Sequence, residues 1–284
     1  MILDGKKVAE EIKQQLKNEI AEAVDGGKRA PHLVIMTIGE DPASKVYVRN
    51  KVRACEELCI TVDHLTYTPD TPVALIKSDI ERCNRDSNID GIMVQLPLPA
   101  GYDERELIDC IDPVKDVDGL TTINIGKLRS GQPCIKPCTA QGIIDLLDYY
   151  NIELDGKDVT IVGRSNIVGK PLADLMMERG ATITQCHSHT YDVRAKTFNA
   201  HIIVSAIGKP QAINGEYMSY GTAVVDVGIN RDENGKLCGD VDFEEVKDCC
   251  SYITPVPGGV GPLTVVELMK NTVECWRKFS DGIY

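Results

Sequence analysis

The chain has 284 residues, of which 43% are apolar, and carries a formal net charge of -12 with an isoelectric point near 4.9. This length allows one large domain or two ordinary ones, and the acidic balance argues against nucleic acid or an anionic membrane as the main partner. Met1-Ile2-Leu3 runs directly into Asp4, so we expect no secretion signal, and no apolar run is long enough to cross a bilayer. The eleven cysteines are scattered through apolar segments, which predicts reduced thiols in a cytoplasmic protein.

Helical and extended patterns alternate along the first third of the chain. Apolar residues recur every four positions from Val8 to Val24, which predicts an amphipathic helix over 3–26. Strands are expected at 33–38, 61–67 and 92–96, with helices over 41–58 and from 72 onward between them. Such alternation predicts an α/β fold with a parallel sheet covered on both faces.

The pattern continues beyond a proline-bearing boundary at 133–137. We expect a helix from 139 to about 150, then strands at 159–162, 182–186, 202–206, 223–227 and 252–254. The last long helix begins at about 263. The sequence therefore predicts two domains: residues 1–138 together with a returning C-terminal helix at about 263–284, and a Rossmann-like dinucleotide-binding domain at 139–262.

The strongest local signal lies where the strand at 159–162 ends. The β-branched run breaks at Gly163, a short polar turn follows, and apolar residues resume at helical spacing from Leu172. A glycine between a strand and a helix amino terminus is where an open α/β sheet holds a phosphate. The letters G-R-S-N-I-V-G are not the full G-x-G-x-x-G motif, so an ordinary strand-turn-helix connection is the alternative.

The second strand of this domain indicates which dinucleotide is bound. NAD sites usually place a carboxylate at the end of this strand, yet none appears until Asp192. Arg164 in the first turn and Ser188 after the second strand favour a 2′-phosphate, so the sequence predicts NADP. Cys186, His187 and His189 do not complete a zinc-like spacing, and we predict no metal.

Tyr47 and Lys51 are the first candidates for chemistry. They lie four apart on the helix at 41–58, and therefore on one face. A buried lysine beside a phenol can have its pKa lowered and serve as an acid or base near neutral pH. The alternative is a surface lysine whose stem packs on the tyrosine. Gln95, at the end of the strand at 92–96, is either a hydrogen-bonding handle for a lysine or ring, or a solvent-facing strand end.

Two further segments could bind a flat ligand. Asp116 and Asp118 would face one side if their segment is extended, where a carboxylate could accept two hydrogen bonds from an amidine-like ring edge; metal binding is the competing interpretation. The glycines at 258, 259 and 261 would let the backbone approach a flat ligand closely, or would simply cap the last helix. Pro255 and Pro257 favour a fixed loop shape.

Taken together, these motifs resemble those of the bifunctional methylenetetrahydrofolate dehydrogenase/methenyltetrahydrofolate cyclohydrolase family. The resemblance runs nearly end to end and rests on segments 39–44 (GEDPAS), 47–51 (YVRNK), 90–99 (DGIMVQLPLP), 115–119 (KDVDG), 137–139 (PCT), 163–169 (GRSNIVG), 226–230 (DVGIN) and 254–262 (TPVPGGVGP). The family usually has Pro at Ala140, Gly at Cys59 and Met at Leu263. These departures concern local loop geometry and fall on no proposed catalytic group.

The resemblance implies specific roles for these residues. Lys51 would be the catalytic acid/base, tuned by Gln95, while Tyr47 packs on the folate and Asp118 holds the pterin edge. The folate pocket would be lined by Tyr47, Lys51, Val94, Gln95, Leu96, Asp118, Pro257, Gly258 and Gly261. The NADP contacts would be Gly163, Arg164, Ser165, Ser188 and Ile229.

The resemblance also implies NADP-dependent oxidation of 5,10-methylenetetrahydrofolate and hydrolysis of the methenyl product to 10-formyltetrahydrofolate. It places the chain in one-carbon metabolism that serves purine biosynthesis, as a cytoplasmic homodimer. Two alternatives stay open: a dehydrogenase without hydrolase activity that uses NAD or NADP, and a folate- or nucleotide-binding protein without turnover.

Overall fold

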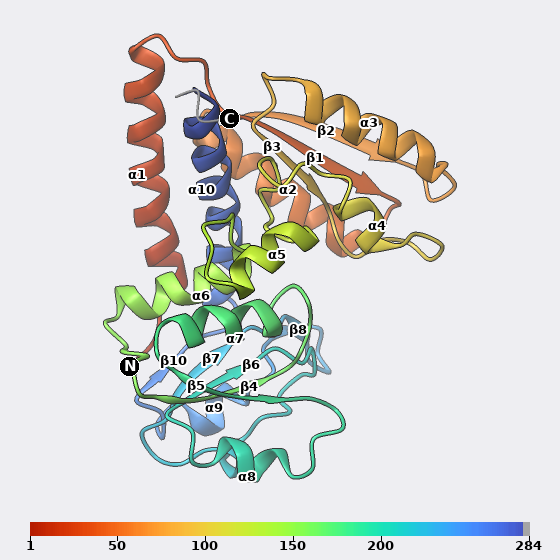
Figure 1. Cartoon of the computed structure of the whole chain (residues 1–284). Helices are drawn as coiled ribbons and strands as arrows, with labels where there is room; N and C mark the ends of the chain where they lie inside the picture. The colour runs from red at the N-terminus through yellow and green to blue at the C-terminus, as the bar shows by residue number, and fades with distance from the viewer. Residues whose placement is uncertain (281–284) are drawn as a thin grey trace. The chain divides into compact units, whose positions relative to one another are not determined.

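The computed structural model describes residues 1–280, the side chain of Ala43 excepted, and these residues form two compact units. The five-stranded unit comprises Met1–Glu10 and Thr139–Thr264, and the three-stranded unit comprises Glu11–Cys138 and the chain from Val265 onward. Helices α1 (Gly5–Asp25) and α10 (Val260–Ser280) each contribute residues to both units (Figure 1). Residues 281–284 of the predicted C-terminal helix lie outside the described residues.

The three-stranded unit is built on a parallel sheet in the order β2-β1-β3. Its strands are β1 (His32–Ile38), β2 (Thr61–Tyr67) and β3 (Gly91–Val94). Its helices are α2 (Pro42–Glu57), α3 (Val73–Arg85), α4 (Glu104–Ile108) and α5 (Thr122–Arg129). β3 stops at Val94, two residues before its predicted end, so Gln95 and Leu96 lie beyond the strand.

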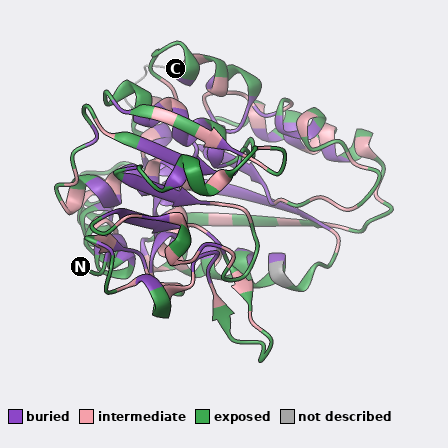
Figure 2. Ribbon diagram, turned by 90° about the horizontal axis from the view of Figure 1, so that it is seen from below, coloured by how far each residue is buried: buried purple, intermediate pink, exposed green. Residues whose placement is uncertain are grey.

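Alternating residues of β1 form the centre of this unit's core. Val34, Met36 and Ile38 point to the face covered by α3 and α4, where Ile76 and Leu107 are fully buried. β3 is buried along its whole length and β1 from Leu33 onward, whereas no residue of β2 is buried; buried strand segments are purple in Figure 2. Burial of both faces explains why β1 reads as an unbroken apolar run.

The five-stranded unit contains a second parallel sheet, in the order β10-β7-β6-β4-β5. Its strands are β4 (Asp158–Val162), β5 (Thr182–Cys186), β6 (Ile202–Ser205), β7 (Ala223–Asp226) and β10 (Tyr252–Ile253). The order reverses at β4, whose two neighbours are β5 and β6. In an open parallel sheet a ligand binds outside the carboxyl ends of the strands at such a reversal.

Helices and a small hairpin complete this unit. They are α6 (Cys138–Tyr149, whose first residue belongs to the three-stranded unit), α7 (Gly169–Glu178), α8 (Val193–Thr197), the short η1 (Gly215–Tyr217), α9 (Phe243–Val246), and the hairpin of β8 (Asn230–Arg231) and β9 (Leu237–Cys238). Met1–Glu10 also belongs here, because Ile2 pairs with Ile253 beside β10. The predicted α/β architecture with a Rossmann-like second sheet is confirmed. No helix within residues 1–280 combines the length and the apolar character needed to span a membrane.

Candidate active site

Helix α2 fixes the positions of Tyr47 and Lys51. Asp41 caps the helix by accepting a 2.7 Å hydrogen bond from the backbone N–H of Ser44, and Pro42 occupies the first turn. Lys51 is only 8% exposed, whereas Tyr47 is 39% exposed. The alternative of a surface lysine is therefore wrong: the ammonium group is buried, and the phenol one turn away stays accessible.

The partner of Lys51 is the neutral side chain of Gln95. Lys51 Nζ donates to Gln95 Oε1 at 3.0 Å and lies 3.6 Å from Met93 Sδ. Gln95 is itself held by its backbone N–H on Met36 O at 2.8 Å and by its side-chain Nε2 on Leu96 O at 2.6 Å. An amide oxygen accepts a hydrogen bond from a charged or a neutral lysine, whereas a carboxylate would favour the charged form. Gln95 is buried, so the interpretation as a solvent-facing strand end is wrong.

The same face of α2 carries a residue that the sequence reasoning missed. Ser44 precedes Tyr47 by three positions, and its buried hydroxyl oxygen has no hydrogen-bond partner among the residues that the structure describes. Buried polar atoms are rarely left unpaired. This hydroxyl is therefore available to a ligand that lies against the face of Tyr47 and Lys51.

Asp116 and Asp118 have different environments, and the extended segment that was the condition for both to face one side does not form. Their segment is a turn, so the alternation of an extended strand does not apply. The buried carboxylate of Asp116 accepts hydrogen bonds from Leu120 N at 3.2 Å, Thr121 N at 2.8 Å and Asn124 Nδ2 at 2.9 Å. Burial raises the pKa of Asp116, and these donors oppose the rise. Asp116 thus organises the start of α5, and Asp118 remains the half-buried candidate.

Asp118 lies next to the thiol of Cys138, to which the sequence analysis assigned no role. Cys138 is buried, which raises its pKa well above the usual value, and the charge of Asp118 adds to that rise. Asn271 of α10 reaches the same place, donating through Nδ2 to Val117 O at 2.9 Å and lying 3.5 Å from Cys138 Sγ. Lys51 and Glu267 also act electrostatically on this thiol, so the structure gathers Lys51, Asp118 and Cys138 in one polar cluster.

The turn after β4 requires glycine at both of its ends. Gly163 has φ +133°, and a Cβ there would lie 2.4 Å from Ala206 O. A Cβ on Gly169 would lie 2.4 Å from Gly163 O. Ser165 Oγ accepts from the backbone N–H groups of Val168 at 3.2 Å and Gly169 at 3.4 Å, so it already caps part of the amino end of α7.

The groups that could receive a phosphate here are side chains. Arg164 and Ser165 are exposed in the turn after β4, and Ser188 is exposed after β5, the strand next to β4. Asp192, the first carboxylate beyond β5, accepts from Ala195 N at 3.1 Å and caps α8. This set of donors fits an NADP 2′-phosphate. Among residues 1–280 there is no group of three or more His, Cys, Asp or Glu side chains arranged to hold a metal ion.

Ile229 and the glycine-rich loop lie together in the five-stranded unit. Ile229 is 47% exposed, and its Cδ1 is 3.9 Å from the position that a Cβ on Gly261 would take. Gly258 has φ +109°, and its carbonyl accepts from Lys6 N at 3.1 Å. Pro257 is exposed beside it. The substrate residues predicted at 257–261 therefore belong to this unit, and Val94 and Leu96 belong with Lys51 to the three-stranded unit.

Known families match both halves of the chain. Residues 3–118 match the family described as tetrahydrofolate dehydrogenase/cyclohydrolase, catalytic domain, and residues 137–280 match the NAD(P)-binding domain of the same family. Two relatives carry the name "Bifunctional protein FolD". The protein of Agathobacter rectalis is 48% identical to this chain, over 98% of this chain and 99% of its own length. The protein of Halothermothrix orenii is 50% identical, over 98% of both chains.

Solved structures agree with these relatives. The bifunctional dehydrogenase/cyclohydrolase of Campylobacter jejuni superposes with a TM-score of 0.96 at 41% identity, over 98% of this chain and 99% of that one. The enzyme of Trypanosoma brucei, solved with NADP cofactor and an inhibitor, gives a TM-score of 0.92 at 36% identity, over 98% and 97% of the two chains. The chain therefore belongs to the tetrahydrofolate dehydrogenase/cyclohydrolase family, with a catalytic domain followed by an NAD(P)-binding domain.

Proposed function

We propose that this chain oxidises 5,10-methylenetetrahydrofolate with NADP and then hydrolyses the methenyl product to 10-formyltetrahydrofolate. The observation that carries the proposal is the buried Lys51, hydrogen-bonded at 3.0 Å to the neutral amide of Gln95, with the exposed Tyr47 one helical turn away on α2. Among the described residues, the hydrogen-bond partners of Lys51 Nζ are the amide of Gln95 and the sulfur of Met93, and a lysine amine in such a position can serve as a general acid or base. Its surroundings match what the hydrolytic step requires.

In the first step, a hydride leaves the bridging carbon of the folate and a methenyl cation remains. Bound NADP supplies the hydride acceptor. The residues of this chain orient the substrate: Tyr47 packs on the folate rings, Asp118 accepts hydrogen bonds from the pterin edge, and Val94 and Leu96 line the pocket beside Lys51. Gly163, Arg164, Ser165, Ser188 and Ile229 contact the dinucleotide, with Arg164 and Ser188 on the 2′-phosphate.

In the second step, water adds to the methenyl carbon, and the bond from that carbon to one ring nitrogen breaks. Lys51 Nζ moves a proton from the attacking water toward the leaving nitrogen, so that the formyl product and one proton result. Gln95 holds Nζ in place without fixing its charge. The enzyme works as a cytoplasmic homodimer, and its formyl product supplies one-carbon units for purine biosynthesis.

The test is an absorbance time course with Lys51→Met and with Lys45→Met as a matched control on the same helix. Lys45 is exposed and pairs with Glu40 at 3.4 Å, so its loss should leave both reactions unchanged. In Lys51→Met we expect methenyl decay to fall at least ~100-fold, because general acid–base catalysis contributes about that much, while NADP affinity stays the same. Methenyl decay at the wild-type rate in Lys51→Met would refute the role of Lys51, and NADP reduction without any decay in wild type would leave a plain dehydrogenase.

A further inference from the structure

Two buried aspartates that the proposed reaction does not use lie at the carboxyl ends of β6 and β7. Asp226 is the last residue of β7 and is 3% exposed, and Asp240, just after β9, is fully buried. Burying two carboxylates close together is unfavourable unless each is surrounded by donors. The contacts of each aspartate therefore indicate what the pair holds in place.

The carboxylate of Asp240 joins three segments of the sheet edge. It accepts hydrogen bonds from Ser205 Oγ at 3.1 Å, at the end of β6, and from the backbone N–H groups of Ile207 at 2.7 Å and Lys209 at 2.9 Å in the following loop. It also accepts from Asn230 Nδ2 at 2.9 Å, just past β7. One side chain thus fixes the chain after β6 and the chain after β7.

Asp226 in turn binds the backbone of the segment that carries Asp240. Its carboxylate accepts from the backbone N–H groups of Gly228, Asp240 and Val241, each at 2.9 Å. A Cβ on Gly228 would lie 2.3 Å from Asp240 Oδ1, and a Cβ on Gly239 would lie 1.8 Å from Asp226 Oδ2. The Asp240 carboxylate therefore packs against Gly228, two residues after Asp226. The Asp226 carboxylate packs against Gly239, the residue before Asp240. Burial raises the pKa of Asp226 to about 6, the charge of Asp240 adds to the rise, and the three N–H donors oppose it.

The segments that this pair holds surround the predicted cofactor residues. Ile229 lies between Gly228 and Asn230, and each of these neighbours donates to one of the two carboxylates. In the chain after β6, Ala206 O is the atom that a Cβ on Gly163 would meet, so this segment also backs the turn after β4. A dinucleotide whose 2′-phosphate is bound after β5 extends across β4 toward β6 and β7.

We propose that Asp240, supported by Asp226, is a positioning residue that holds the loops after β6 and β7 in the shape that receives the nicotinamide half of NADP. The proposal rests on the proposed function, because it takes NADP as the ligand of this edge. The aspartates touch no reacting atom. They act through the backbone on both sides of Ile229 and through the loop at 206–209.

The experiment compares Asp240→Asn with the wild-type full chain. The substitution keeps the shape but replaces one acceptor oxygen with an amide donor, facing groups that all donate to Asp240. Calorimetric titration with NADP should show at least ~10-fold weaker binding, since hydrogen bonds to a buried charge are lost, and the KM for NADP should rise in parallel. Hydrolysis of supplied methenyl substrate, which depends on Lys51, should stay within about twofold. Asp242→Asn is the matched control: among the described residues the Asp242 side chain accepts only from Glu245 N, where it caps α9, so both readouts should be unchanged.

A milder variant keeps the proposal testable if Asp240→Asn does not fold. Asn230→Ala removes one hydrogen bond to Asp240 and should weaken NADP binding about three- to tenfold, again without loss of hydrolysis. Wild-type NADP affinity in a folded Asp240→Asn or in Asn230→Ala would overturn the proposal, as would equal losses of NADP binding and hydrolysis. Wild-type protein that binds NADP but oxidises no folate would refute the proposed function alone, since the calorimetric comparison would still decide the role of Asp240.

Discussion

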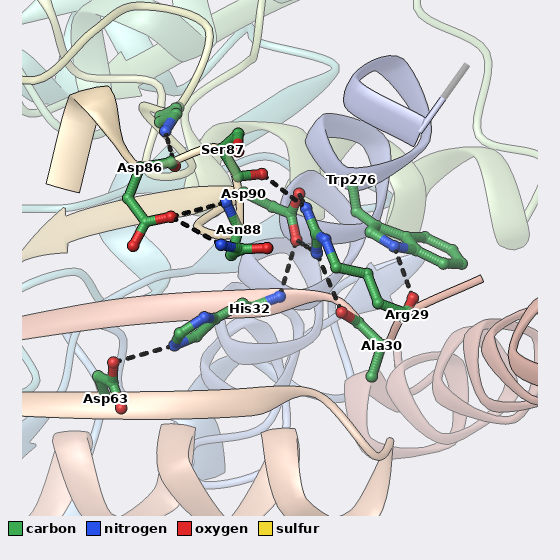
Figure 3. Close-up of polar contacts among 10 residues, drawn as sticks. Arg29, Ala30, His32, Asp63, Asp86, Ser87, Asn88, Asp90 and Trp276 are labelled. Atoms are coloured by element: carbon green, nitrogen blue, oxygen red, sulfur yellow. Dashed lines mark hydrogen bonds and ion pairs between the residues drawn. The ribbon is translucent and has the colours of Figure 1, made fainter. Parts of the chain in front are cut away.

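The ion pair of Arg29 and Asp90 should stabilise the three-stranded unit without affecting catalysis. Arg29 donates through both terminal nitrogens to the carboxylate of Asp90, at 2.6 and 2.7 Å. Asp90 also accepts a hydrogen bond from His32 N at 2.8 Å (Figure 3). These contacts lie at the amino ends of β1 and β3, whereas Gln95 follows the carboxyl end of β3. The perturbation is Arg29→Met, which keeps the stem of the side chain and removes the charge.

The size of the effect follows from the unequal exposure of the two partners. The side chain of Asp90 is fully buried, so the substitution leaves a desolvated carboxylate with one backbone donor. Removing one partner of a buried pair costs about 3–5 kcal/mol, but the Arg29 side chain is 36% exposed and solvent screens part of the interaction. We therefore expect the free energy of unfolding to fall by about 2–3 kcal/mol. The 3.0 Å bond from Trp276 Nε1 to Arg29 O involves the backbone and should persist.

The assay is urea unfolding followed by circular dichroism, with Arg179→Met as the matched control. Arg179 makes a similar two-nitrogen pair with Asp148, at 2.8 and 2.9 Å, but both side chains are 47% exposed, so its loss should cost less than about 1 kcal/mol. Adding Asp90→Asn to Arg29→Met should restore part of the stability, since a neutral amide needs no cation. Equal losses for Arg29→Met and Arg179→Met would refute this reasoning, as would a loss of methenyl hydrolysis in folded Arg29→Met.

Three further changes test other features of the chain. Cys59 has φ +59°, where a side chain is strained, so Cys59→Gly should raise the free energy of unfolding by about 0.5–1 kcal/mol in urea titrations, and a decrease would contradict the assignment of strain. Gln95→Glu would place a carboxylate 3.0 Å from Lys51 Nζ and hold its proton; we expect methenyl decay to slow at least ~10-fold with unchanged NADP affinity, and an unchanged rate would count against a proton-transferring lysine. Gly163→Ala would place a Cβ 2.4 Å from a backbone oxygen and should weaken NADP binding more than ~10-fold by calorimetry. Gly156→Ala is the control, because Gly156 has φ +68° but open space around it, and NADP binding should not change. Equal NADP affinities of the two variants would show that the turn tolerates the extra atom.

Local pattern alone was enough to predict most of the elements. The apolar run at 33–38 corresponds to β1, and the run at 61–67 coincides with β2. Helices of four or five residues, such as α4 and α9, were not predicted, because so few residues complete little more than one helical turn and leave no periodicity to detect. β3 was predicted too long: it ends at Val94, three residues before Pro97, which has no backbone N–H to continue a strand.

In the candidate site too, some features are local in the sequence and others arise only from the fold. The four-residue spacing of Tyr47 and Lys51 and the glycine after β4 are local features, so the sequence determined them. The bond from Lys51 to Gln95 joins residues 44 positions apart, and only the pairing of β1 with β3 brings that amide to α2. Asp116 and Asp118 look equivalent in sequence, but a turn sends one carboxylate to α5 and leaves the other beside Cys138.

By itself, the sequence determined the α/β class, the strands that would be buried and the residue types available for folate and NADP chemistry, because these depend on composition and short-range spacing. The tertiary structure alone decided which polar groups are buried and which donors satisfy them. The contacts of Asp240 with Ser205, Ile207, Lys209 and Asn230 come from segments up to 35 residues away, and no short-range pattern encodes them. A buried charge is stabilised by the groups that the fold brings to it, and those groups are defined only once the strands have paired.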